Sequence, residues 1–234
     1  MIGYAGMNNT LREREPPVRA NKTMQKKTWE ERGLQYAGEL AVQNFKGLIQ
    51  ILRWNVEHDI IFYRTPSKLV PWHSQFDITD LPQYGELQTV AEQCGDIVRQ
   101  NNMRLTFHPS HWCKLASKSN DTVERSLTTI ENHAVWFDLM GLDHSQYYSV
   151  NVHIGGHYGD KKKTAERLLD NISELSTNAK SHLVLENDDK DGLWSALELV
   201  QYFGDEIPIT FDYHHHKFTT DGLTYKEAFE KCAD

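Results

Sequence analysis

Six short apolar runs in this sequence each end on a residue that could bind a metal ion or grip a substrate. In a barrel built from strand–helix repeats, every strand delivers its last residue to one rim, where active sites are built. Two imidazoles and two carboxylates at that rim suit divalent metals such as Mn²⁺ or Zn²⁺. The runs close on Tyr4 (from Met1), Arg64 (from Ile60), His108 (from Met103), His153 (from Tyr148), Glu186 (from Leu183) and Asp212 (from Ile207).

The strongest local signal is the segment Asp212–His216, Asp-Tyr-His-His-His. A carboxylate at a strand end, with His215 three residues later, can place two ligands on one ion. A cluster of surface histidines without a metal is the alternative explanation of the same sequence. Glu186 ends a buried run, where an uncompensated carboxylate is costly, so a metal or an arginine is required. Taken singly, His108 and His153 could be core histidines. Taken with the two acids, they favour a metal centre.

Amphipathic helical patterns separate these runs. Strand–helix alternation predicts parallel strands with right-handed crossovers, hence an α/β fold of the TIM-type (β/α) barrel class. About six of the eight strands are visible, so residues 1–234 are expected to form a single barrel domain that is short at its C-terminal end. The predicted helices are Thr28–Val56 (opened by a capping box, Thr28 with Glu31), Leu87–Gln100, Thr122–Met140, Lys163–Leu175, Trp194–Phe203 and Tyr225–Cys232.

The composition fits one globular domain: 234 residues, 39% hydrophobic and 25% charged. The net charge of −8 argues weakly against nucleic acid, but the segment Leu11–Lys27 is locally basic and could contact phosphate or be a solvated loop. Three cysteines without disulfide spacing, no signal peptide and no apolar span of ~20 residues predict a cytoplasmic or nucleoid-associated protein that is not secreted and has no membrane partner.

Two further features point to a ligand. Glycines at 155, 156 and 159 would let the backbone approach a ligand closely, in a spacing that is not a dinucleotide fingerprint. Trp112 beside His111 offers a flat apolar face, which is either a core aromatic or a surface for stacking on a base.

Several of these blocks, in this order along nearly the whole chain, resemble the UV damage endonuclease family. That family consists of metal-dependent (β/α) barrels that nick DNA 5′ of cyclobutane pyrimidine dimers and 6-4 photoproducts, and it is structurally related to apurinic endonucleases. The blocks are Gly3-Tyr4 with Asn8, Phe107-His108-Pro109, Arg125-Ser-Leu127, His153-Ile-Gly-Gly-His-Tyr-Gly-Asp-Lys161, Leu185-Glu-Asn-Asp-Asp189 and Asp212–His216.

The resemblance implies a DNA repair endonuclease in which a metal-activated water cleaves the phosphodiester, leaving a 3′-hydroxyl and a 5′-phosphate. Up to three divalent ions are implied, usually Mn²⁺, with Mg²⁺ or Zn²⁺ as alternatives. The implied substrate is UV-damaged double-stranded DNA; we expect a monomer and no nucleotide cofactor. The implied catalytic residues and metal ligands are His108, His153, Glu186, Asp212 and His215.

The resemblance also assigns residues to the DNA. Tyr4 and Asn8 match residues that hold DNA beside the lesion, and His111 and Trp112 stand where many members carry the Gln and Tyr that probe it. A family histidine in a Pro-x-Ala-Ser-His loop is replaced, and His73 is a candidate substitute.

The family's further ligands, on a seventh and an eighth strand, have no counterpart in the sequence. We therefore expect this chain by itself to bind metal incompletely. Two other functions stay open: a metal-dependent sugar isomerase or epimerase of the same barrel class, and a non-cleaving binder of damaged DNA.

Overall fold

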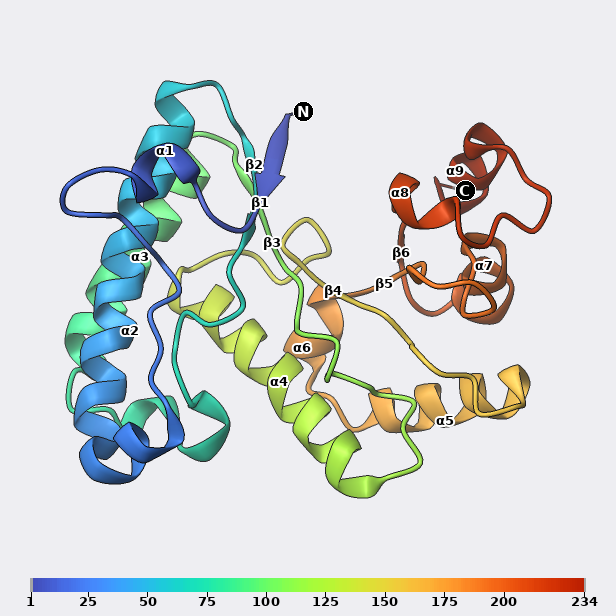
Figure 1. Cartoon of the computed structure of the whole chain (residues 1–234), viewed down its shortest axis with the longest axis horizontal. Coiled ribbons are helices and arrows are strands. Elements are labelled where there is room, and N and C mark those ends of the chain that lie inside the picture. The colour runs from blue at the N-terminus through green and yellow to red at the C-terminus, as the bar shows by residue number, and fades with distance from the viewer. Residues whose placement is uncertain (1, 234) are drawn as a thin grey trace. The chain divides into compact units, whose positions relative to one another are not determined.

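The computed structural model describes residues 2–233, which divide into two compact units. The first unit holds residues 2–108 and 132–143, and the second holds residues 109–131 and 144–233. Each unit contributes three strands in sequence order, and every recorded strand pairing is parallel. Six parallel strands alternating with helices make an α/β fold, as predicted (Figure 1).

The strands of the first unit are β1 (Gly3–Ala5), β2 (Phe62–Thr65) and β3 (Arg104–Phe107). They pair in the order β1-β2-β3, with Tyr4 opposite Tyr63 and Tyr63 opposite Leu105. All three lie within or beside the predicted runs. Met1, where the first run was predicted to begin, lies outside the described residues.

Two long helices, α2 (Lys26–Glu57) and α3 (Tyr84–Gln100), pack side by side in the first unit (Figure 1). The predicted apolar stripe of α2 forms its buried face, because Ala37, Phe45 and Leu48 are fully buried. The predicted capping box at Thr28 is wrong: the helix begins at Lys26, after Gln25, and Thr28 lies inside the first turn.

The remaining elements of the first unit are short and were not predicted: α1 (Asn9–Arg12), η1 (His73–Gln75) and η2 (Ile78–Asp80). Helix α4 (Asn120–Leu139), predicted as Thr122–Met140, crosses the division between the units in sequence. Asn8 caps α1 by accepting the backbone N–H of Leu11 at 2.9 Å. A single satisfied cap is enough to start such a turn.

The second unit pairs β4 (Ser149–Val152), β5 (Leu183–Glu186) and β6 (Ile209–Thr210). Strand β6 is shorter than the predicted run from Ile207, which contains Pro208, a residue without a backbone N–H for a strand ladder. The helices of this unit are α5 (Lys161–Ser173), α6 (Thr177–His182), α7 (Ala196–Phe203), α8 (Tyr213–His216) and α9 (Tyr225–Ala233). Helices α7 and α9 contact each other (Figure 1), and α6 and α8 were not predicted.

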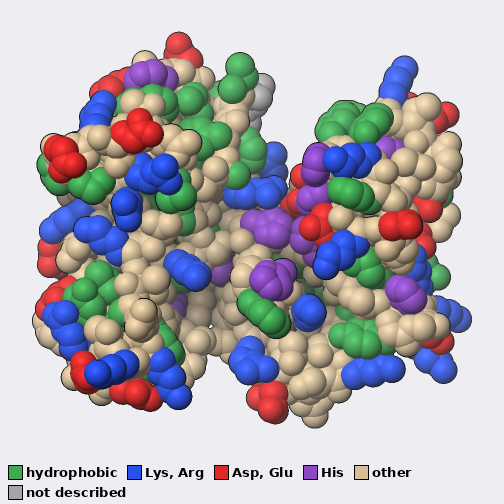
Figure 2. Space-filling model, in the orientation of Figure 1, with side chains coloured by type: hydrophobic (Ala, Val, Ile, Leu, Met, Phe, Trp, Pro, Cys, Tyr) green, Lys and Arg blue, Asp and Glu red, His purple; other side chains and the backbone are tan. Residues whose placement is uncertain are grey.

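The surface seen in Figure 2 carries basic and acidic side chains interspersed, with histidines exposed among them. The net charge of −8 is therefore not spread as one uniform acidic face. Among residues 2–233, no helix is both long and apolar enough to cross a membrane.

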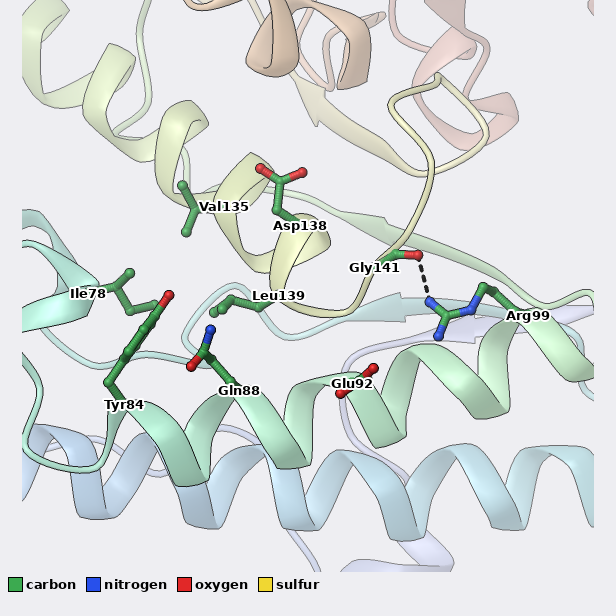
Figure 3. Close-up of a pocket in the computed structure, with 9 residues that line it drawn as sticks. All are labelled: Ile78, Tyr84, Gln88, Glu92, Arg99, Val135, Asp138, Leu139 and Gly141. Atoms are coloured by element: carbon green, nitrogen blue, oxygen red, sulfur yellow. Dashed lines mark hydrogen bonds between the residues drawn. The ribbon is translucent and has the colours of Figure 1, made fainter.

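A pocket of about 410 Å³ lies between α3 and the end of α4 in the first unit (Figure 3). Its lining includes Tyr84, Gln88 and Glu92, and Arg99 donates to the carbonyl of Gly141 across one end at 2.6 Å. None of the site residues predicted from the sequence is among its lining residues.

Candidate metal centre

Strand β4 turns a polar row to one face and an apolar row to the other. Side chains alternate along a strand, so Ser149, Asn151 and the following His153 share one face, while Val150 and Val152 share the opposite one. Both rows are buried within the strand. The side chains of a polar row inside a buried strand require hydrogen-bond partners.

Strands β5 and β6 extend the same polar face. Asn151 lies opposite Val184 in the parallel register, so Glu186, two residues beyond Val184, also points to this face. Glu186 lies opposite Thr210, and Asp212 follows Thr210 by two residues. The carboxyl ends of three consecutive strands therefore bring His153, Glu186 and Asp212 to one place.

Glu186 is the fully buried centre of this arrangement, with 0% of its surface exposed. Its Oε2 accepts a hydrogen bond from the Asn151 side-chain amide at 3.0 Å. Its Oε1 lies 3.6 Å from Nδ1 of His215 and 4.0 Å from Nε2 of His153. One carboxylate oxygen is thus held by the protein while the other faces the two imidazoles.

The two histidines are oriented by neighbouring peptide carbonyls at the end of β5. Nδ1 of His153 lies 3.1 Å from the carbonyl oxygen of Glu186, and Nδ1 of His215 lies 2.9 Å from that of Asn187. A carbonyl only accepts, so each Nδ1 donates in these two contacts. Histidines that bind metals commonly anchor their other ring nitrogen in this way.

Asp212 and His215 are placed by a one-turn helix. Oδ1 of Asp212 accepts the backbone N–H of His215 at 2.9 Å and so caps α8. The side chain of Asn187 brackets the Asp212 backbone, with its Oδ1 accepting the N–H at 2.7 Å and its Nδ2 donating to the carbonyl at 3.1 Å. The cap and the bracket together fix the carboxylate relative to the imidazole.

Asp188 is a further buried acid beside His153, and the sequence analysis assigned it no role. It is 4% exposed, and burial raises its pKa to about 7 despite backbone hydrogen bonds from Trp194 and Gly155. Its Oδ1 lies 3.9 Å from Nδ1 of His153, and its Oδ2 has no hydrogen-bond partner. Three acids within the four residues Glu186–Asp189, at the end of an apolar strand, were the signal that could have found it.

These donors fit a divalent ion. Glu186, Asp212 and His215 can each offer one ligand atom, and those atoms lie within 4.8 Å of one another. A buried carboxylate is compensated by a cation, and mixed imidazole and carboxylate donors suit Mn²⁺ or Zn²⁺.

Two other histidines considered as metal ligands, His108 and His73, lie in the first unit. His108 directly follows β3, at the carboxyl end where it was predicted. His73 is buried, and its Nδ1 accepts the indole N–H of Trp136 at 3.0 Å. Burial lowers the pKa of His73 to about 4. These contacts describe a neutral core histidine, and His73 is in neither group of described residues able to hold a metal.

Tyr4 and Asn8 are brought together within the first unit. The Tyr4 hydroxyl accepts from the Asn8 amide at 2.9 Å and donates to Asn55 at 2.9 Å. Burial raises the pKa of Tyr4. Asn8 is itself 5% exposed and caps α1, so both side chains have structural contacts in addition to the predicted role at DNA.

His111 and Trp112 lie at the surface of the second unit. Their ring centroids are 4.6 Å apart, and Trp112 is 72% exposed. An indole this exposed is not a core aromatic, and a role in stacking on a base stays a prediction.

The basic segment of the first unit is exposed at Arg14, Arg19 and Lys22. Lys26 and Lys27 pair with the acids one turn later in α2, at 3.6 and 3.9 Å. Exposed pairs of this kind hold little energy, so these lysines can exchange partners readily.

Comparison with known proteins places this geometry in a family. The UV-endonuclease UvdE family matches residues 1–234. UV DNA damage endonucleases of Bacillus cereus (strain B4264) and Bacillus anthracis (strain A0248) are 33% and 32% identical over 175 and 179 residues, which cover 74% and 76% of this chain and 54% and 55% of theirs. The chain thus spans about half the length of these curated relatives.

Solved structures agree on the fold. The crystal structure of SacUVDE matches 98% of this chain and 75% of its own, with a TM-score of 0.85 and 27% identity. D-psicose 3-epimerase from Clostridium cellulolyticum H10 matches 79% of this chain and 63% of its own, with a TM-score of 0.56 and 14% identity, and shows likeness of fold alone. From the whole-chain family match and these relatives, the chain belongs to the UV-endonuclease UvdE family.

Proposed function

We propose that this chain carries the metal-binding part of a DNA repair endonuclease that nicks the phosphodiester 5′ of UV photoproducts, both cyclobutane pyrimidine dimers and 6-4 photoproducts. The observation that carries the proposal is the convergence of His153, Glu186, Asp212 and His215 at three neighbouring strand ends, with both Nδ1 atoms anchored on carbonyls. Membership of the UvdE family supports the choice of DNA as the substrate.

In this proposal, His153, Glu186, Asp212 and His215 are the ligands that the second unit supplies, and His108, at the end of β3, is a fifth. Divalent ions, Mn²⁺ first with Mg²⁺ or Zn²⁺ as alternatives and up to three in a complete site, would supply Lewis acidity and an activated water. The carboxylates provide the negative charge that retains the ions, and the neutral imidazoles limit how much of that charge accumulates.

Recognition is assigned to the four residues that match DNA-contacting positions of the family. Trp112 and His111 would probe a duplex distorted by the lesion, and Tyr4 with Asn8 would hold the strand beside it. A photoproduct stacks poorly, so extruding it costs a few kcal/mol less than extruding normal bases. UV-damaged double-stranded DNA is therefore the proposed partner of a monomeric protein.

The test is strand scission of an end-labelled duplex, irradiated or not, in the presence of Mn²⁺, by the chain extended at its C-terminus to the length of its curated relatives. We expect one cut 5′ of the lesion, with 3′-hydroxyl and 5′-phosphate ends, and none in the unirradiated duplex. His215→Ala should abolish cutting, whereas His58→Ala, at an exposed histidine of the first unit, should leave it unchanged.

Two results would replace the proposal. Salt-sensitive binding to irradiated DNA without cutting, when Mn²⁺ is bound, would identify a non-cleaving binder of damaged DNA. Turnover of a ketose or aldose, without affinity for irradiated DNA, would identify a sugar isomerase or epimerase, whose fold this chain shares.

A further inference from the structure

We propose that Asn151 is a positioning residue that fixes which oxygen of Glu186 is presented to a metal, and that Ser149 holds Asn151 in place. The inference rests on the proposed metal centre and goes beyond it, because neither residue would touch the ion. Both residues are buried in β4, on the face that leads to His153.

The three side chains form a short hydrogen-bonded chain across β4 and β5. The Ser149 hydroxyl donates to Oδ1 of Asn151 at 2.8 Å, and Nδ2 of Asn151 donates to Oε2 of Glu186 at 3.0 Å. Exposure is 0% for Ser149, 3% for Asn151 and 0% for Glu186. Water therefore does not compete for these bonds, which makes each of them directional and costly to lose.

The direction of the Asn151 amide follows from the chemistry of its neighbours. An ionised carboxylate only accepts hydrogen bonds, so the amide must turn its NH₂ group toward Glu186. Its oxygen then faces Ser149, whose hydroxyl can donate. With the amide reversed, two oxygens would face each other beside Glu186. The carboxylate of Glu186 thus selects the amide orientation, and the Ser149 hydroxyl, which can donate or accept, adds a hydrogen bond that holds the amide there.

The consequence concerns Oε1 of Glu186. With Oε2 retained by Asn151, rotation of the carboxylate is blocked, and Oε1 stays within 3.6–4.0 Å of the two imidazoles. Glu186 would then bind through Oε1 alone. Without Asn151, the carboxylate could turn both oxygens toward the ion, and its buried charge would lose its amide donor.

The experiment titrates the whole chain with Mn²⁺ alone, by calorimetry and by electron paramagnetic resonance. We expect Asn151→Ala to weaken Mn²⁺ binding by about tenfold or more, the range typical of partners that orient ligands. The resonance spectrum of the bound ion should also change, because its carboxylate ligation changes. Ser149→Ala should weaken binding less, since the amide is still present.

Asn44→Ala is the matched control. Asn44 is an equally buried asparagine of the first unit that bonds the backbone of Lys22, Lys68 and Leu69. Its loss should lower the melting temperature and leave the Mn²⁺ affinity and spectrum unchanged.

An affinity and a spectrum of Asn151→Ala identical to wild type would overturn the inference while leaving the metal centre intact. If that variant does not fold, Ser149→Ala decides in its place, and an unchanged affinity there overturns the inference. Failure of the wild-type chain to bind Mn²⁺ would instead overturn the metal centre itself, and the inference with it.

Discussion

At the end of β5, two successive peptide carbonyls and two side-chain amides orient the candidate metal ligands. The carbonyls of Glu186 and Asn187 hold the imidazoles, the amide of Asn151 holds the carboxylate of Glu186, and the amide of Asn187 holds the backbone of Asp212. The candidate ligands therefore lie at strand ends and at a helix cap, where hydrogen bonds fix the orientation of each side chain. Metal sites require ligands oriented in this way.

The acid sensitivity of the first unit is expected to come in part from His73. Burial lowers its pKa from 6.5 to about 4, so between these values the unfolded chain binds a proton that the folded chain does not. The stability that neutral His73 contributes is complete above pH 6.5 and is lost as the pH falls through 4. The shift corresponds to roughly 3 kcal/mol.

Urea unfolding of wild type and His73→Gln across that pH window measures this contribution. The fall in unfolding free energy on acidification should be smaller in His73→Gln, while exposed His58→Gln should behave as wild type. Equal slopes in wild type and His73→Gln would show that His73 is not the group responsible.

Trp112 is expected to affect binding without affecting stability, because it is 72% exposed. Trp112→Ala should change the unfolding free energy by no more than about 0.5 kcal/mol. It should weaken binding to an irradiated duplex by about 1–3 kcal/mol, the value of one stacked base. Fluorescence anisotropy measures the binding, and Trp112→Phe, which keeps a ring, should recover most of it. Unchanged binding by Trp112→Ala would remove the residue from the interface.

Residue types at strand ends could be predicted, whereas their supporting partners could not. His153, Glu186 and Asp212 followed from strand ends alone. Asn151 was missed although Ser149, Asn151 and His153 form a polar row at every second position, because a polar row inside a buried strand reads equally well as ordinary core hydrogen bonding. Which reading applies depends on the neighbouring strand, and that register is not visible in a single sequence.

At the scale of elements, helix α2 contains a break at Gly33, and its apolar stripe begins only after that residue. The stripe begins at Leu34, directly after Gly33, whose φ of 51° and ψ of −143° interrupt the helix. This backbone region is essentially restricted to glycine. Lys26 to Arg32 and the long segment after Gly33 are therefore two helical pieces joined at one residue.

Gly33→Ala is expected to cost about 1–3 kcal/mol of unfolding free energy through backbone strain alone. No atom lies within 4 Å of the added methyl group, so no steric clash contributes. Gly85→Ala is the control, because Gly85 also faces open space but lies in α3 with a negative φ. That substitution should be neutral or stabilising by about 0.5–1 kcal/mol. Equal effects in the two variants, measured by urea unfolding, would refute the strain.

Periodicity located the long helices and apolar runs located the strands, but the ends of elements were less predictable. The short helices α1 and α8 were missed although Asn8 and Asp212 are their caps. Those two residues had been read for function alone. A capping side chain and a ligand use the same oxygen chemistry, so residue type does not distinguish the two roles.

At the scale of the whole molecule, the chain spans about half the length of its curated relatives, yet the second unit alone presents four candidate ligands. They lie at or after the ends of three consecutive strands, and Glu186, Asp212 and His215 form a group of described residues of the second unit that could hold an ion. The number of bound ions was the property least predictable from the sequence, because it depends on the ligands at the ends of all the strands of the barrel.

The most direct test of the metal centre is anomalous diffraction at the manganese absorption edge from crystals of the chain soaked in Mn²⁺. We predict a peak within bonding distance of His153, Glu186, Asp212 and His215, and its loss in Glu186→Gln crystals treated identically. Crystals that show no peak among these four side chains, or a peak elsewhere that Glu186→Gln leaves unchanged, would contradict the account.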